Sequence, residues 1–167
     1  MADKDLVFIY SDGSAKPNPG KGGYGTVVKY ANPDFSVYRV DEFAEGFKTT
    51  TNNRMELMGV ITGVASLQRP SLISITTDSS YVVNAFEKRW IPYWIKNDWH
   101  TSTGNEVKNP DLWQRLIELL QPHEFKFNWI KGHNGFLDNE RCDYLATTAA
   151  RGVTFVKDEY GFLHVSN

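Results

Sequence analysis

The sequence predicts a single α/β domain: a mixed five-stranded sheet, three antiparallel strands and then two parallel ones, with helices on both faces. The chain has 167 residues, 41% of them hydrophobic, which suffices for one core but not for two ordinary domains. Short apolar runs are followed by segments whose apolar residues recur every three or four positions, which indicates helices. Consecutive strands favour a meander, whereas strands joined by a helix favour parallel pairing.

The first half of the sheet is expected from residues 6–11, 24–30 and 35–47. The first run is apolar at both alternating sets of positions, which is typical of a central strand covered on both faces. The glycines and prolines that follow it predict a tight turn before the second strand. They are Gly13, Pro17, Pro19, Gly20, Gly22, Gly23 and Gly25. The three strands should form an antiparallel meander.

The second half is expected to alternate helices and strands. Residues 52–67 repeat apolar side chains at helical spacing, and 73–77 form a strand that should run parallel to the first. Further helices are predicted at 79–88, at 90–95 and from Pro110, where Asn109 is placed as a cap. A strand at 125–130 precedes a last helix that ends at Ala150. Residues 151–167 form a tail, either a short strand or a loose extension.

Four acidic residues stand in settings that would aim them at one point. Asp12 ends the first apolar run, Asp78 follows the strand at 73–77, and Glu56 and Asp143 fall early in helices. Ligands bind at the carboxyl ends of strands in open α/β sheets, and carboxylates there suit hard cations. Singly, Asp12 would also suit a turn, Asp78 a helix cap, and Glu56 a solvent-facing first helical turn. Together the four favour a metal site.

The charge balance and the cysteine usage exclude few classes of function. The formal charge is −2 and the pI is near 6.1, which argues against a partner held by bulk positive charge. Neutralising the four carboxylates gives −2 + 4 = +2, so a phosphate-rich substrate remains compatible. The single cysteine, Cys142, forms no internal disulfide, and neither a secretory signal nor a run of ~18 apolar residues is present. We expect a cytoplasmic monomer outside the membrane.

Motif by motif, the sequence resembles bacterial-type ribonuclease H of type 1. The resembling segments follow the family's order and span positions 11 to about 146. They are Ser-Asp-Gly-Ser at 11–14, Asn-Pro-Gly at 18–20, Gly-Gly-Tyr-Gly at 22–25, Thr-Thr-Asn-Asn-Arg-Met-Glu-Leu at 50–57, Thr-Asp-Ser at 77–79, Lys-Asn at 108–109, Asp-Leu-Trp at 111–113, and 129–143. The resemblance implies an RNase H-like fold, with residues 1–150 as the catalytic domain.

The resemblance implies that Asp12, Glu56, Asp78 and Asp143 bind two Mg²⁺ ions, for which Mn²⁺ is a possible substitute. It also implies an endoribonuclease that hydrolyses the RNA strand of RNA/DNA hybrids to 5′-phosphate and 3′-hydroxyl ends. Physically, two ions about 4 Å apart supply an attacking hydroxide, stabilise the leaving alkoxide and neutralise the gathering charge. Magnesium prefers oxygen ligands. Without metal, the like charges would repel and some would take up protons.

His133 lies in the glycine-bracketed segment 131–135. Histidine titrates near neutrality and can carry a proton during hydrolysis, although a lone exposed histidine is more often inert. The resemblance implies a catalytic role for His133. We therefore expect its removal to slow turnover, whereas loss of Asp12 or Asp78 should be near-fatal.

Substrate selection is expected from neutral groups. The resemblance implies that three asparagines, with one serine as a weaker match, contact minor-groove edges and the 2′-hydroxyls that distinguish RNA from DNA. These residues are Asn18, Asn52, Asn53 and Ser80. It also assigns a phosphate of the DNA strand to Thr51 and Asn109. Thr51, Asn52 and Asn109 equally suit helix caps, and the two roles are compatible.

The segment 90–108 departs from the basic protrusion of many bacterial members. It holds Lys96 and Lys108, offset by Asp98 and Glu106, so a weak electrostatic grip with a shallow salt dependence is expected. Its tryptophans are expected to pack against the domain; they are Trp90, Trp94 and Trp99. Two alternatives to the hybrid-cleaving enzyme stay open: a non-catalytic nucleic-acid-binding scaffold and a DNA-cutting nuclease of the same fold.

Overall fold

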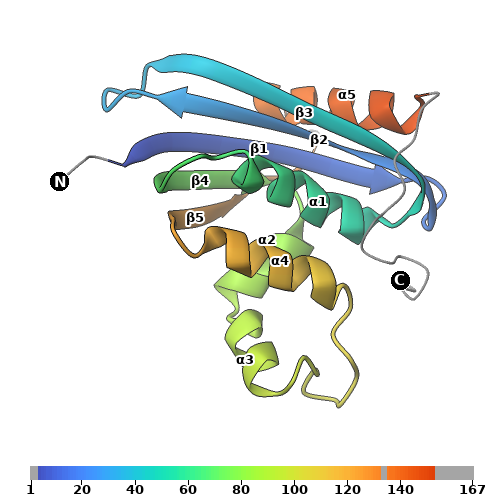
Figure 1. Cartoon of the computed structure of the whole chain (residues 1–167). Helices are drawn as coiled ribbons and strands as arrows, with labels where there is room; N and C mark the ends of the chain where they lie inside the picture. The colour runs from blue at the N-terminus through green and yellow to red at the C-terminus, as the bar shows by residue number, and fades with distance from the viewer. Residues whose placement is uncertain (1–3, 133–134, 153–167) are drawn as a thin grey trace.

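The computed structural model describes residues 4–132 and 135–152 and has one five-stranded mixed sheet at its centre (Figure 1). The strands are β1 (Asp5–Ala15), β2 (Gly20–Ala31), β3 (Val37–Thr50), β4 (Ser71–Thr77) and β5 (Glu124–Trp129). Their order across the sheet is β3-β2-β1-β4-β5. The first three pair antiparallel, whereas β4 pairs parallel with both β1 and β5. This confirms the predicted fold class.

Helices cover both faces of the sheet. They are α1 (Asn52–Ala65), α2 (Ser80–Glu87), α3 (Trp90–Lys96), α4 (Pro110–Leu120) and α5 (Leu137–Ala150). Figure 1 shows α5 alone on one face, over the antiparallel strands, and the other four on the opposite side. The order of elements is the predicted one. Within the described part of the chain, no helix is both long and apolar enough to span a membrane.

The β1–β2 hairpin differs from the prediction, because most of the glycines lie within strands and not in a turn. The turn is confined to residues 16–19, while Gly13 lies in β1 and Gly25 in β2. A Cβ added to Gly13 would collide with the Met55 carbonyl of α1, and one added to Gly25 with the Cys142 carbonyl of α5. Glycine is therefore needed here because helices on both faces approach the sheet backbone.

The third strand also starts later than predicted. Phe35 has a φ of 70°, a left-handed conformation, and its N–H donates to the Asn32 carbonyl at 2.8 Å. These features close a turn, so β3 begins at Val37 instead of at residue 35. The sequence pattern does not reveal this turn, because Phe35 is apolar and continues the pattern of a strand.

The tryptophans of the segment 90–108 pack against the domain, as predicted. Trp94 is buried, and its ring centroid lies 6.1 Å from those of both Trp90 and Trp99 and 5.5 Å from that of Trp113 in α4. Trp113 is fully buried. This aromatic cluster attaches α3 and the following loop to the helices on that side of the sheet.

The close approach of α5 to β2 yields a stability prediction. Gly25→Ala should lower the free energy of unfolding by about 2–4 kcal/mol, because the added methyl must displace the α5 backbone. Gly59→Ala is the matched control: its Cβ would lie 3.2 Å from the nearest atom, the Ser11 Cβ, and alanine favours the helix, so the change should stay within about 1 kcal/mol. Urea denaturation measures both; equal effects would contradict the packing argument.

Candidate active site

Three carboxylates converge where β1, α1 and β4 meet. One oxygen from each of Asp12, Glu56 and Asp78 lies within 4.8 Å of the other two. Among the residues that the structure describes, these three form the group that is placed to hold a metal ion. The parallel register pairs Ser11 with Thr77, so the residues that follow them, Asp12 and Asp78, emerge side by side. The predicted convergence of these three carboxylates is observed.

Glu56 reaches the cluster from α1, which covers the face of the sheet opposite to α5. It is 8% exposed; its Oε1 accepts the Gly13 N–H at 2.8 Å and its Oε2 the Thr77 hydroxyl at 3.4 Å. The close contact between Met55 and Gly13 presses the first turn of α1 against β1 and so sets the position of Glu56. A solvent-facing role for Glu56 is therefore wrong.

The ordinary alternatives for the two aspartates are also wrong. Asp12 lies inside β1, paired with Gly25, and not in a turn. Asp78 does not cap α2; Ser79 does, since its hydroxyl accepts the Val82 N–H at 3.3 Å. Both carboxylates are thus left to face the cluster.

Asp143 approaches from the other face of the sheet, on α5. It is not one of the three mutually close carboxylates, but it is hydrogen-bonded to Asp12, and this bond and its charge raise the pKa of Asp12. The segment that leads into α5 also passes the cluster: a Cβ on Gly132 would lie 2.6 Å from Asp78 Oδ2. His133 itself lies outside the described residues.

Burial and mutual repulsion shift the proton affinities of the cluster. Desolvation, followed by the charge of Asp78, raises the pKa of Asp12 to about 7. Desolvation, followed by the charges of Asp12 and Asp78, raises the pKa of Glu56 well above its usual value. The interaction between the two side chains lowers the pKa of Asp12 and raises that of Glu56, so of the two carboxyls Glu56 is the one whose protonated form it favours. A divalent cation fits this all-oxygen set, because it would replace the protons and cancel the repulsion.

The asparagines predicted to read the substrate lie beside this cluster. Asn52 Oδ1 accepts the Ala15 N–H at 2.6 Å, and the Asn52 N–H donates to Asn18 Oδ1 at 3.0 Å. Each amide oxygen therefore points inward, which directs the NH₂ group away from these contacts. Asn53 is part-exposed beside them, and Ser80 is exposed at the start of α2.

Thr51 and Asn109, in contrast, are both buried. The Thr51 hydroxyl caps α1 by accepting the Arg54 N–H at 3.1 Å. Asn109 occupies the predicted cap position before α4, and its carbonyl accepts the Trp113 N–H at 3.1 Å, but its side chain makes no capping bond. With a φ of 56°, Asn109 instead accepts from Arg54 Nη1 at 3.2 Å and donates to the Tyr81 hydroxyl at 3.1 Å.

Arg54 is the residue of this region that sequence reasoning missed. It is fully buried in the first turn of α1 and forms two hydrogen bonds with the Asp111 carboxylate, at 2.9 and 3.2 Å. It thereby joins α1 to the start of α4 and orients Asn109. A basic residue is unfavourable near the positive end of a helix dipole. An arginine in the first turn of a predicted helix therefore indicated that it has a partner elsewhere in the fold, and this was the available sequence signal.

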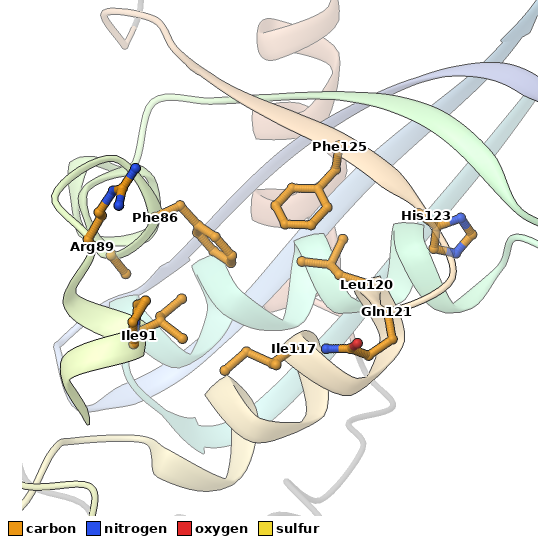
Figure 2. Close-up of a pocket in the computed structure, with 10 residues that line it drawn as sticks. Phe86, Arg89, Ile91, Ile117, Leu120, Gln121, His123 and Phe125 are labelled. Atoms are coloured by element: carbon orange, nitrogen blue, oxygen red, sulfur yellow. The ribbon is translucent and has the colours of Figure 1, made fainter. Parts of the chain in front are cut away.

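An apolar groove elsewhere in the molecule is not the active site. It encloses about 360 Å³ between the carboxyl ends of α2 and α4, the start of α3 and the start of β5 (Figure 2). Its lining includes Phe86, Ile91, Leu120 and Phe125. None of the predicted site residues lines it, and the carboxylates lie at the other end of the parallel strands.

The buried charge of Arg54 yields a second prediction. Asp111→Ala should lower the free energy of unfolding by about 2–4 kcal/mol, because it removes a carboxylate that makes two hydrogen bonds with the buried guanidinium. Asp5→Ala is the matched control: it also breaks a two-bond aspartate–arginine pair, but its partner Arg69 is 71% exposed, so less than about 1 kcal/mol is expected. Similar losses in a denaturant titration would refute the role of Arg54.

The raised proton affinity of Asp12 predicts how stability depends on pH. Between its usual pKa of 3.8 and its folded pKa of about 7, the folded state holds a proton that the unfolded state has released. The free energy of unfolding of the metal-free protein should therefore fall as pH rises through this window.

Asp12→Asn should remove this penalty. In chelator at pH 8 we expect the variant to be about 1–3 kcal/mol more stable than the wild type, and at pH 4 the two should be alike. Thermal unfolding monitored by circular dichroism measures the difference, and an equal effect at both pH values would contradict the assignment.

Comparisons with known proteins identify the family of this chain. A family model described as RNase H matches residues 3–151. A ribonuclease H of Lachnoclostridium phytofermentans is 47% identical over 91% of this chain and 96% of its own length. A ribonuclease HI of Synechocystis sp. is 42% identical over 92% of both chains.

Solved structures share the fold. The crystal structure of LC9-RNase H1, described as a type 1 RNase H with the type 2 active-site motif, has a TM-score of 0.79 at 29% identity and covers 99% of this chain and 83% of its own. LC11-RNase H1, solved in complex with an RNA/DNA hybrid, has a TM-score of 0.63 at 21% identity over 87% of this chain and 96% of its own, a likeness of fold alone. The family match and the curated relatives show that this chain belongs to the RNase H family.

Proposed function

We propose that this chain is an endoribonuclease that hydrolyses the RNA strand of RNA/DNA hybrids with two bound Mg²⁺ ions, or Mn²⁺ in their place, leaving 5′-phosphate and 3′-hydroxyl ends. The observation that carries the proposal is the convergence of Asp12, Glu56 and Asp78 from three separate elements, with Asp143 beside Asp12. The family relationship supports it, since curated relatives are named ribonuclease H.

The four carboxylates would hold the ions. Bound there, paired divalent ions supply Lewis-acid stabilisation of the attacking and leaving oxygens of a phosphodiester. The Gly13 N–H donates to the Glu56 carboxylate, which fixes the position of this carboxylate in the site. Asp12 and Asp78 are partly exposed and would face the substrate.

The remaining roles belong to residues around the cluster. Asn18, Asn52 and Asn53, with Ser80, would contact the hybrid and sense its 2′-hydroxyls, because their amide and hydroxyl groups can donate to ribose oxygens. Thr51 and Asn109 would contribute to a phosphate site of the DNA strand, supported by the Arg54 charge beneath them. His133 would carry a proton to or from the departing 3′ oxygen.

The two alternatives are less well supported. A scaffold that had lost catalysis would have no need to hold repelling carboxylates together, yet Asp12 and Glu56 are held at raised pKa values. A DNA-cutting enzyme would have no use for the hydroxyl-sensing amides beside the cluster. We further propose that residues 1–150 act as a monomeric catalytic domain in the cytoplasm.

A gel assay tests the function directly. RNA/DNA hybrid, double-stranded RNA and double-stranded DNA are each incubated with the protein, with Mg²⁺ and with chelator. We expect cleavage of the RNA strand of the hybrid only, and only with Mg²⁺. Cleavage of DNA alone, or of no substrate, would overturn the proposal.

Two variants separate the metal site from the proton carrier. Asp78→Asn should lower kcat by about 10³-fold or more, a loss of about 4 kcal/mol of transition-state stabilisation, because it removes a charge from the metal-binding set. His133→Ala should lower kcat by about 10–100-fold without abolishing activity. Asp98→Asn, an exposed aspartate in the segment 90–108, is the control and should leave kcat unchanged. Equal losses in the first two variants would contradict these roles.

A further inference from the structure

A cationic cavity lies between the β1–β2 hairpin and the end of α5. It encloses about 400 Å³ and is lined by Ser14, Lys16, Lys21, Thr147, Ala150 and Arg151. Three of these six residues carry a positive charge, two carry a hydroxyl group, and none is acidic. None belongs to the site described above.

Backbone packing fixes the walls of this cavity. The Lys16 N–H donates to the Lys21 carbonyl at 2.9 Å, so the two lysines flank the turn of the hairpin. A Cβ on Gly23 would lie 2.6 Å from the Ala146 oxygen, which shows that the last turns of α5 press against β2. Arg151, the residue that ends α5, is thereby held beside the hairpin.

The cavity and the carboxylate cluster share two elements, β1 and α5. Ser14 follows Asp12 by two residues in β1, so both side chains lie on the α5 face of the sheet. The Thr147 hydroxyl donates to the Asp143 carbonyl at 2.9 Å. At the helical rise per residue, Thr147 and Arg151 lie about 6 and 12 Å along α5 from Asp143.

The chemistry of the cavity suits a phosphate. Three cationic side chains and no acidic one line the cavity, so its lining attracts an anion even beside the carboxyl end of α5, which carries a partial charge of about −0.5. Hydroxyl groups and cationic side chains are the usual donors to phosphate oxygens. The chain as a whole carries −2, so this cluster does not simply reflect a basic surface. One nucleic-acid strand presents a phosphate about every 3.4 Å of helix axis, so for a hybrid lying along α5 a displacement of 6–12 Å would correspond to about two to four nucleotides.

We propose that Lys16, Lys21 and Arg151, with the hydroxyl of Ser14, form a subsite for a backbone phosphate of the cleaved RNA strand, about two to four nucleotides from the cut. This inference rests on the proposed function. The RNA strand is assigned because β1 and α5, which line the cavity, also supply Asp12 and Asp143 to the cluster. In this proposal the hairpin contributes electrostatic binding of the hybrid, whereas the segment 90–108 is expected to contribute little.

Kinetics of charge-neutral variants test the subsite. K16Q/K21Q and R151Q are compared with K4Q/K126Q, a control that also removes two lysine charges and whose lysines are exposed on the opposite half of the sheet. With hybrid substrate and Mg²⁺, we expect KM to rise about 5–20-fold in the subsite variants, with kcat unchanged within about twofold. The slope of log(kcat/KM) against log salt should become shallower by about 0.7–0.9 for each phosphate that is no longer neutralised, and the control should match the wild type.

A hybrid with one uncharged methylphosphonate linkage identifies the strand. Placed in the RNA strand two to four nucleotides from the cut, on one side or the other, it should weaken the wild type but not weaken K16Q/K21Q further. Coupling that appears only with the linkage in the DNA strand would overturn the strand assignment. If the wild type cleaves hybrid and the subsite variants keep its KM and salt slope, the subsite is refuted while the proposed function stands; no cleavage by the wild type would overturn both.

Discussion

Repulsion among closely spaced carboxylates is the central constraint on this structure. One oxygen from each of Asp12, Glu56 and Asp78 lies within 4.8 Å of the other two, and burial and mutual charge raise the pKa values of the first two residues. The fold tolerates this because rigid elements impose the positions. The parallel register of β1 and β4 sets the two aspartates side by side, and the Gly13 N–H holds Glu56. Such pre-set repulsion is what a divalent cation relieves on binding.

The same packing that creates the cluster organises its surroundings. The strand glycines bring α1 and α5 against the sheet from opposite faces, so that acidic residues from both helices meet at β1. Beneath the predicted DNA-phosphate residues, Arg54 joins α1 to α4 through Asp111 and Asn109. On the other side of the cluster, the end of α5 and the β1–β2 hairpin form a cationic cavity. A chain of net charge −2 thus separates its charges into an acidic centre and basic flanks.

Local pattern was sufficient for the order and type of every element, because apolar spacing distinguishes strands from helices within a short window. It was insufficient where a residue serves a neighbour distant in sequence. Gly23 was assigned to a turn, although it lies in a strand and packs against Ala146 of α5. Asn109 stands at the predicted cap position of α4, but its side chain binds Arg54 and Tyr81 and not the helix backbone. Phe35 continued the pattern of a strand but closes a turn.

By itself, the sequence determined the fold class, the family and the identity of the acidic residues, since each of these is written in short motifs and in the spacing of apolar side chains. Only the tertiary structure decided that Glu56 is buried, that Arg54 supports Asn109, and that three cations gather where the hairpin meets the end of α5. Burial, proton affinity and the neighbours of a charge depend on groups far away along the chain, and their positions exist only once strands and helices have packed.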